Sequence, residues 1–205
     1  MKPALKICGM KYNTDAVADL APAYLGFIFY EGSKRNFEGP MPVLPEEIQK
    51  VGVFVQASVE EILEKVHTYS LNVVQLHGGE DETYVAQLQE ALPNVKLWKV
   101  FHVGETFNFA QLEPFEPLVD AFLLDTQGTT LGGTGKRFNW KVLEQYTTTK
   151  PLVLSGGIGP AHLSAIQELM TTYNLPIHAI DVNSKFEHRP GEKDTTLLKQ
   201  FIDGL

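Results

Sequence analysis

Two residues whose side chains suit proton transfer stand at the ends of short apolar segments. Cys8 closes the segment 4–8, and Asp125 closes the segment 121–125. A thiolate can remove a proton as a general base, and a carboxylic acid can donate one as a general acid. An unpaired carboxylate is costly in a core, so Asp125 needs either a chemical role or a turn to cap. Cys8 has a second interpretation as a small core residue, because cysteine is among the most buried residue types.

A lysine two residues before the cysteine bears on the same chemistry. Side chains alternate between the two faces of a strand, so Lys6 and Cys8 share one face and Ile7 takes the other. By the same rule Asp125 lies opposite to Leu124, and we expect Lys6, Cys8 and Asp125 to point inward. An ammonium group close to Cys8 is expected to lower the thiol pKa and to supply thiolate near neutral pH.

Two segments near the C-terminus predict an anion site. Gly156 and Gly157 lie within residues 155–160, which read Ser-Gly-Gly-Ile-Gly-Pro, while Asn183 and Ser184 follow the last apolar segment. Glycine allows a close backbone approach, and N–H groups at the start of a helix attract phosphate. A tight turn explains a Gly-Gly pair equally well. Arg35 is the candidate for bidentate binding of a carboxylate, with a solvated surface arginine as the alternative.

Eight short apolar segments alternate with eight segments of helical pattern. The alternation predicts βαβ units, a parallel sheet and right-handed crossovers, and eight units predict a closed (β/α)8, or TIM, barrel. An open doubly wound sheet would favour a glycine-rich first turn, where only Cys8 and Gly9 stand. No linker divides residues 1–205, so a single domain is expected. The expected strands are 4–8, 24–29, 51–56, 73–77, 97–101, 121–125, 152–155 and 177–182, and the expected helices are 14–20, 45–50, 59–69, 83–92, 107–115, 140–146, 161–172 and 195–202.

A barrel of this kind places all these candidates together. Active sites lie at the carboxyl ends of the strands, and phosphate is commonly bound by the loops after strands seven and eight. We expect residues 131–136, Leu-Gly-Gly-Thr-Gly-Lys, to form a loop over the site. Structural filling of the barrel is one interpretation of the inward-facing Lys6, Gln75, His77 and Lys99, and it is the one we favour for His77.

The composition narrows the possible partners. The 205 residues are 43% hydrophobic and 20% charged, which is typical of a globular domain, and no apolar run is long enough to cross a bilayer. The net charge of −8 argues against nucleic acid or an anionic membrane as a partner, but a small anion can still be held locally. A single cysteine cannot form an intrachain disulfide, which favours the reducing cytoplasm.

In order and at sensible spacing along nearly the whole chain, the motifs resemble those of phosphoribosylanthranilate isomerases, enzymes of tryptophan biosynthesis. They are KICG (6–9), GFIF (26–29), SKR (33–35), VGVFV (51–55), VQLHG (74–78), DT (125–126), GGTG (132–135), FNW (138–140), GGI (156–158), and DV (181–182) through PG (190–191) to KD (193–194).

The resemblance implies an Amadori rearrangement of a phosphorylated amino sugar by cofactor-free and metal-free acid–base catalysis. Cys8 would be the general base, Asp125 the general acid and Arg35 the anchor of the anthranilate carboxylate. The loops at 156–157 and 183–184 would bind the phosphate. The expected partner is this small-molecule substrate, and the expected assembly is a monomer or a homodimer. Lys185 departs from the family pattern, which has glycine at this point.

Three other classes of function remain open on the residues alone. A Schiff-base lyase or aldolase would use Lys99 or Lys6 as its nucleophile. A non-catalytic sugar-phosphate-binding protein would have no need of both Cys8 and Asp125. A metalloenzyme is disfavoured, because the six histidines form no HxxxH or HExxH pattern.

Overall fold

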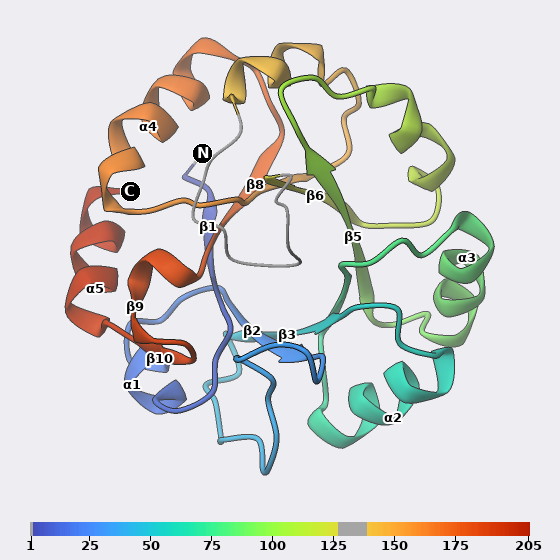
Figure 1. The fold of residues 1–205 in the computed structure, drawn as a ribbon, viewed down its shortest axis with the longest axis vertical. Helices are drawn as coiled ribbons and strands as arrows, with labels where there is room; N and C mark the ends of the chain where they lie inside the picture. Colours follow the sequence, from blue (N-terminus) through green and yellow to red (C-terminus); the bar gives the residue numbers. More distant parts are fainter. Residues whose placement is uncertain (1, 127–138) are drawn as a thin grey trace.

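The computed structural model describes residues 2–126 and 139–205, and its centre is a closed barrel of eight strands (Figure 1). Each strand pairs in parallel with the next along the chain, and the first pairs with the eighth. The predicted (β/α)8 barrel is therefore confirmed. Its strands are β1 (Ala4–Cys8), β2 (Tyr24–Phe29), β3 (Gln49–Phe54), β4 (Val73–Leu76), β5 (Lys96–Val103), β6 (Ala121–Thr126), β7 (Leu152–Leu154) and β8 (Ile177–Val182).

The helices surround the barrel on its outer face (Figure 1). The α-helices are α1 (Thr14–Ala18), α2 (Val59–Tyr69), α3 (Glu82–Ala91), α4 (Leu163–Thr172) and α5 (Thr195–Gly204). The short 3-10 helices are η1 (Phe109–Phe115), η2 (Trp140–Gln145), η3 (Pro160–His162) and η4 (Ser184–Phe186). A small antiparallel hairpin, β9 (Glu187–Arg189) with β10 (Glu192–Lys193), follows the eighth strand and was not predicted.

The predicted helix at 45–50 is wrong. Residues 30–48, all of them described, contain no helix, and β3 already begins at Gln49. The pairing of Gln49 and Lys50 with Tyr24 and Leu25 of β2 explains this, because it leaves only a turn between Pro45 and the strand. The predicted helices at 107–115 and 140–146 form as 3-10 turns, the first with Pro114 inside it.

The apolar side chains divide into two cores, as the alternation of the strands requires. Leu5, Ile7 and Leu124 belong to the larger core between the strands and the helices. Cys8 and Leu123 belong to a smaller core inside the barrel. The predicted inward direction of Cys8 is therefore confirmed, and Asp125 lies two residues after Leu123 on the same face of its strand.

Charged residues inside the barrel are paired. Lys6 on β1 donates to Asp181 on β8 at 2.8 Å, and the lysine is completely buried. Lys99 donates to Glu80 at 2.9 Å and to the carbonyl of Gly78 at 2.7 Å. An unpaired charge in such an interior would carry a large desolvation cost, so these pairs are what allow lysine in the barrel.

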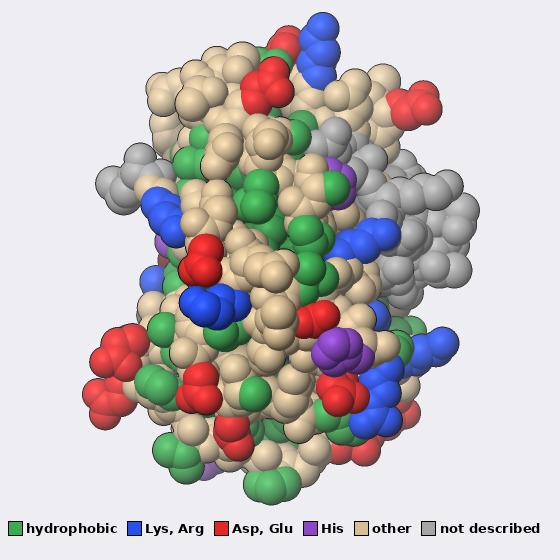
Figure 2. All heavy atoms as spheres, turned by 90° about the vertical axis from the view of Figure 1, so that its left-hand side faces the viewer, with side chains coloured by type: hydrophobic (Ala, Val, Ile, Leu, Met, Phe, Trp, Pro, Cys, Tyr) green, Lys and Arg blue, Asp and Glu red, His purple; other side chains and the backbone are tan. Residues whose placement is uncertain are grey.

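The outer surface mixes both signs of charge. On the face shown in Figure 2, acidic and basic side chains are interspersed among apolar and uncharged ones. Among the described residues, no helix is long and apolar enough to cross a membrane.

Replacing Asp181 by Asn should strongly destabilise the fold. The change leaves the ammonium group of Lys6 buried without a counter-charge, which costs about 3–5 kcal/mol of unfolding free energy. Urea denaturation measures this loss. Asp203→Asn is the matched control, because it breaks an exposed ion pair with Lys199 that is 3.5 Å long; its unfolding midpoint should stay close to that of the wild type. Equal losses in the two variants would contradict the role of the buried pair.

Candidate active site

One cavity at the carboxyl ends of the strands, of about 480 Å³, collects every predicted site residue. Cys8 of β1, Gln75 of β4 and Asp125 of β6 line it, together with the segments that follow β2, β7 and β8. The chemical roles of these residues stay predictions, but the fold brings them together as the barrel hypothesis expected. The predicted residues among its lining are Cys8, Arg35, Asp125, Gly156, Gly157, Asn183 and Ser184. The glycine-rich loop expected at 131–136 lies outside the described residues.

Asp125 has the electrostatic environment of a proton donor. Burial raises its pKa to about 6, although a hydrogen bond from the N–H of Thr126, 2.8 Å long, opposes the rise. The charge of Asp181 adds to the increase and that of Lys6 opposes it. A carboxyl group with this pKa is partly protonated near neutral pH, as a general acid requires.

His77, which we interpreted as filling, lies beside this acid. Its Nε2 is 3.6 Å from Oδ2 of Asp125, and its Nδ1 is 3.1 Å from the amide nitrogen of Gln75. Burial lowers the pKa of His77 to about 3, helped by the charges of His102, Lys6 and Lys99, so the ring is neutral. If the Gln75 amide donates to Nδ1, the ring proton is on Nε2 and faces Asp125. The sequence indicated this position, because Gln75 and His77 alternate with Leu76 in the motif VQLHG and so share the inward face of their strand.

Cys8 reaches the cavity, but the expected effect of Lys6 on it is wrong in its net direction. Burial raises the pKa of the Cys8 thiol, and the nearby charges of Lys6 and Lys193 lower it only in part. The ammonium of Lys6 is already bound to Asp181, whose negative charge also raises the thiol pKa. Without substrate, Cys8 is therefore a protonated thiol at neutral pH.

Two glycines make room for these side chains. A Cβ on Gly26 of β2 would lie 2.9 Å from Sγ of Cys8, too close for real atoms. A Cβ on Gly156 would lie 2.6 Å from the backbone nitrogen of Thr126 and 3.0 Å from Oδ1 of Asp125. Gly156 also has φ +93°, a conformation that favours glycine. The predicted anion loop thus packs directly against the predicted acid.

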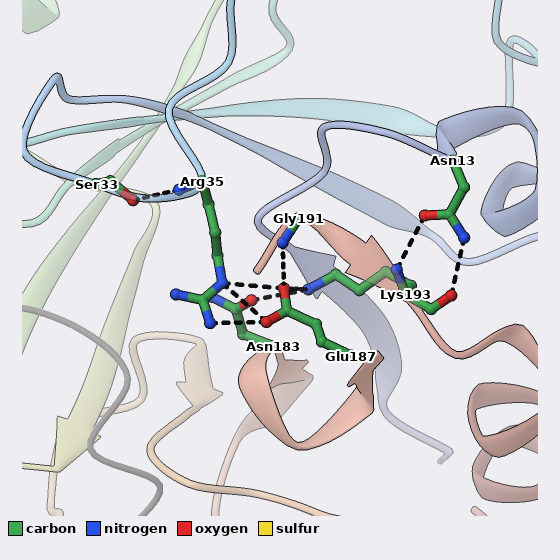
Figure 3. A network of polar contacts seen from close by, with 7 residues as sticks. All are labelled: Asn13, Ser33, Arg35, Asn183, Glu187, Gly191 and Lys193. Carbon is green, nitrogen blue, oxygen red and sulfur yellow. Dashed lines mark hydrogen bonds and ion pairs between the residues drawn. The ribbon is translucent and has the colours of Figure 1, made fainter. Parts of the chain in front are cut away.

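Arg35 is held by a partner that the sequence did not reveal. Its Nε and Nη2 donate to the carboxylate of Glu187 at 2.9 and 2.7 Å (Figure 3). The exposed fraction of the Arg35 side chain is 16%, so it is not the solvated surface arginine of the alternative interpretation. Glu187 stands on the unpredicted hairpin, and no local sequence pattern relates it to residue 35.

The geometry counts against a Schiff-base lysine. A nucleophilic amine must be neutral, whereas Lys6 is paired with Asp181 and its pKa is raised, since this pairing outweighs the effect of burial. Lys99 also forms an ion pair, with Glu80 at 2.9 Å.

One group of side chains could hold a metal ion. Among the described residues, His77, His102 and Asp125 each offer a ligand atom, and these atoms lie within 4.8 Å of one another. Imidazole and carboxylate are ligands that zinc accepts. The absence of a metal requirement stays a prediction.

Fold and cavity together define a (β/α)8-barrel protein that combines an acid, a thiol and two glycine- or polar-rich loops at one end. The chain matches the family model described as N-(5'phosphoribosyl)anthranilate (PRA) isomerase over residues 5–204. It therefore belongs to the N-(5'-phosphoribosyl)anthranilate isomerase family.

Individual relatives agree with this assignment. A protein of that name from Parabacteroides distasonis is 41% identical, over 98% of this chain and 92% of the relative. The crystal structure of phosphoribosyl anthranilate isomerase from Thermotoga maritima is 29% identical with a TM-score of 0.83, covering 99% of this chain and 98% of its own. A phosphoribosyl anthranilate isomerase in complex with reduced 1-(o-carboxyphenylamino)-1-deoxyribulose 5-phosphate is 28% identical with a TM-score of 0.78, at the same coverage.

Replacing Asp125 by Asn should stabilise the protein at high pH relative to the wild type. The pKa of Asp125 is about 6 in the folded state against 3.8 for the free group, so the wild type loses stability as the pH rises from 4 through 6. Asparagine cannot ionise and avoids this loss, which corresponds to about 2–3 kcal/mol. Urea denaturation at pH 4 and pH 8 should show that the unfolding free energy of the variant, relative to that of the wild type, is higher at pH 8. A stability difference that is the same at both pH values would refute the raised pKa.

Proposed function

We propose that this chain catalyses the Amadori rearrangement of N-(5'-phosphoribosyl)anthranilate to 1-(2-carboxyphenylamino)-1-deoxyribulose 5-phosphate, a step of tryptophan biosynthesis. The observation that carries the proposal is the shared cavity, which Cys8 and Asp125 line together with the loops after β7 and β8. Membership of the isomerase family supports it.

Asp125 starts the reaction in this proposal. Its carboxylic acid protonates the ring oxygen of the furanose, and the bond from that oxygen to C1′ breaks. The nitrogen lone pair of the anthranilate stabilises the resulting iminium ion. With a pKa of about 6, about one-tenth of the Asp125 side chains carry the required proton at pH 7.

Cys8 completes it by removing the proton from C2′. The electron pair of that C–H bond neutralises the iminium and gives an enolamine, which tautomerises to the ketose, so no external oxidant or reductant is needed. The thiol pKa is raised in the free protein, so its ionisation needs a further positive charge. The iminium ion supplies that charge next to the sulfur, since a nearby cation stabilises thiolate. The thiol then releases its own proton to solvent, and the thiolate so formed takes up the proton from C2′. Ring opening thus precedes activation of the base.

The two ends of the substrate need separate anchors. The loops containing Gly156–157 and Asn183–Ser184 would hold the phosphate, where glycine allows close approach of backbone N–H groups. The guanidinium of Arg35 would hold the anthranilate carboxylate. We further propose a cytoplasmic location, and a monomer or a homodimer as the working form.

Activity measurements on three variants test this assignment. The assay follows the loss of fluorescence of freshly generated phosphoribosylanthranilate. Cys8→Ser and Asp125→Asn should each lower kcat roughly 10²- to 10⁴-fold, because each removes a proton-transfer group. Arg35→Ala should mainly raise KM, because it removes a binding contact.

The matched control is Asp120→Asn, which alters a carboxylate just before β6, at the opposite end of the strand that carries Asp125. It should retain wild-type kcat. Near-full activity in Cys8→Ala would show that the base is wrongly assigned.

A further inference from the structure

Four polar side chains from separate parts of the chain form one network at the mouth of the cavity (Figure 3). Arg35 comes from the segment after β2, and Asn183 directly follows β8. Glu187 and Lys193 come from the β9–β10 hairpin. Lys193 donates to Glu187 at 2.7 Å and to Oδ1 of Asn183 at 2.8 Å. With the three bonds from Arg35 to Glu187, the four residues form a continuous chain of contacts.

Glu187 fixes the orientation of the Arg35 guanidinium. These bonds occupy Nε and Nη2, and Figure 3 shows the other terminal nitrogen turned away from Glu187. A guanidinium group is planar and its donors have fixed directions, so holding one edge also aims the other. Because Arg35 lines the cavity, its remaining donors are available there for a carboxylate.

Lys193 fixes the orientation of the Asn183 amide. An ammonium group has donors only, so the amide atom that faces it must be the oxygen. The NH2 group of Asn183 is then on the opposite side, where it can donate to an anion. Asn183 lines the same cavity as Arg35. Without Lys193, either side of this amide could face the ligand.

The network is buried and retains a net positive charge. The side chains of Glu187 and Lys193 are 4% and 0% exposed, and two cations face one carboxylate. Burial alone would raise the pKa of Glu187, but hydrogen bonds and charges from Arg35 and Lys193 outweigh it and lower the pKa. Burial lowers the pKa of Lys193 and the charge of Arg35 adds to the fall, while the ion pair with Glu187 opposes it. In its charged form Lys193 offsets the charge of Glu187 and leaves Arg35 able to attract an anion.

Hydrogen bonds from neighbouring residues hold Glu187 and Lys193 in place. The N–H of Gly191 donates to Glu187 at 3.1 Å, and the side chain of Asn13 bonds both the N–H and the carbonyl of Lys193 (Figure 3). A Cβ on Gly9 would lie 2.6 Å from Cδ of Arg35 and 2.7 Å from Oδ1 of Asn183. The glycine after Cys8 therefore leaves the space that both side chains occupy.

We propose that Glu187 and Lys193 are positioning residues for substrate specificity. Glu187 aims Arg35 at the carboxylate of the substrate, and Lys193 aims the Asn183 amide at its phosphate. The ion pair between Glu187 and Lys193 couples the orientations of the two anchors, Arg35 and Asn183. The inference rests on the proposed function, because it assigns the two anionic ends of that substrate.

The first test compares kcat/KM for phosphoribosylanthranilate and for the phosphoribosyl derivative of aniline, which lacks the carboxylate. The ratio for one protein preparation does not depend on how much of it is folded. Glu187→Gln should lower the preference for the carboxylated substrate roughly 10- to 100-fold, because Arg35 is no longer aimed. The control Glu192→Gln alters the same hairpin but breaks only an exposed pair with Arg189, and should keep the wild-type preference.

The second test uses inorganic phosphate as a competitive inhibitor. Lys193→Met removes the group that orients Asn183 and should raise the inhibition constant roughly tenfold, as expected for one charge-assisted contact. Lys199→Met, an exposed lysine of α5, is its control and should leave the constant unchanged.

A double variant separates positioning from a purely structural role. With Arg35→Ala already present, Glu187→Gln should change the substrate preference no further, because both changes remove the same interaction. If Glu187→Gln does not fold, Glu187→Asp replaces it, with the same direction of change expected.

The inference is overturned if the folded Glu187 variant keeps the full preference for the carboxylated substrate, or if Glu192→Gln loses as much of it. An unchanged inhibition constant for phosphate in Lys193→Met overturns it as well. Wild-type protein that converts neither compound would instead contradict the proposed function.

Discussion

The buried ion pair between Lys6 and Asp181 is the interaction on which the rest of the site depends. It joins the first strand to the last at 2.8 Å, where the barrel closes, and it lies within the electrostatic reach of both Cys8 and Asp125. A small closed barrel can hold charge in its interior only as pairs or hydrogen-bonded groups. The pair therefore fixes the floor of the cavity and contributes opposing charges to the two groups above it.

The same low-polarity surroundings shift the pKa of the proposed acid and of the proposed base in the same direction. Burial raises the pKa of both Asp125 and Cys8. This favours the protonated acid, which must donate, and disfavours the thiolate, which must accept. The proposed mechanism reconciles the two, because the acid acts first and creates the positive charge that the base requires. Holding an ionisable carboxyl group there costs stability, a common feature of catalytic sites.

Local sequence predicted the strands better than the helices. The ranges of β1, β2 and β8 agree with the apolar segments, because a buried parallel strand needs a continuous apolar run that turn residues interrupt. The conformation of the segments outside the barrel depends more on the distance that each of them must cover between two strands. Residues 45–50 carry polar and apolar side chains in a helical pattern, and proline is tolerated at the first position of a helix. The pairing of Gln49 with Tyr24 nevertheless makes the segment a turn and a strand.

The sequence by itself determined which chemical groups the site has and which face of each strand carries them, because alternation along a strand is a local property. It predicted that the seven site residues share one end of the barrel, from the position of each after its strand. Only the tertiary structure decided their partners. Arg35 binds a carboxylate 152 positions away, and Lys6 one 175 positions away, so no nearby pattern records either contact. The direction of the pKa shift of Cys8 could not be predicted for the same reason. The thiol is buried, and the charge of Asp181 comes near it, only when distant strands enclose it.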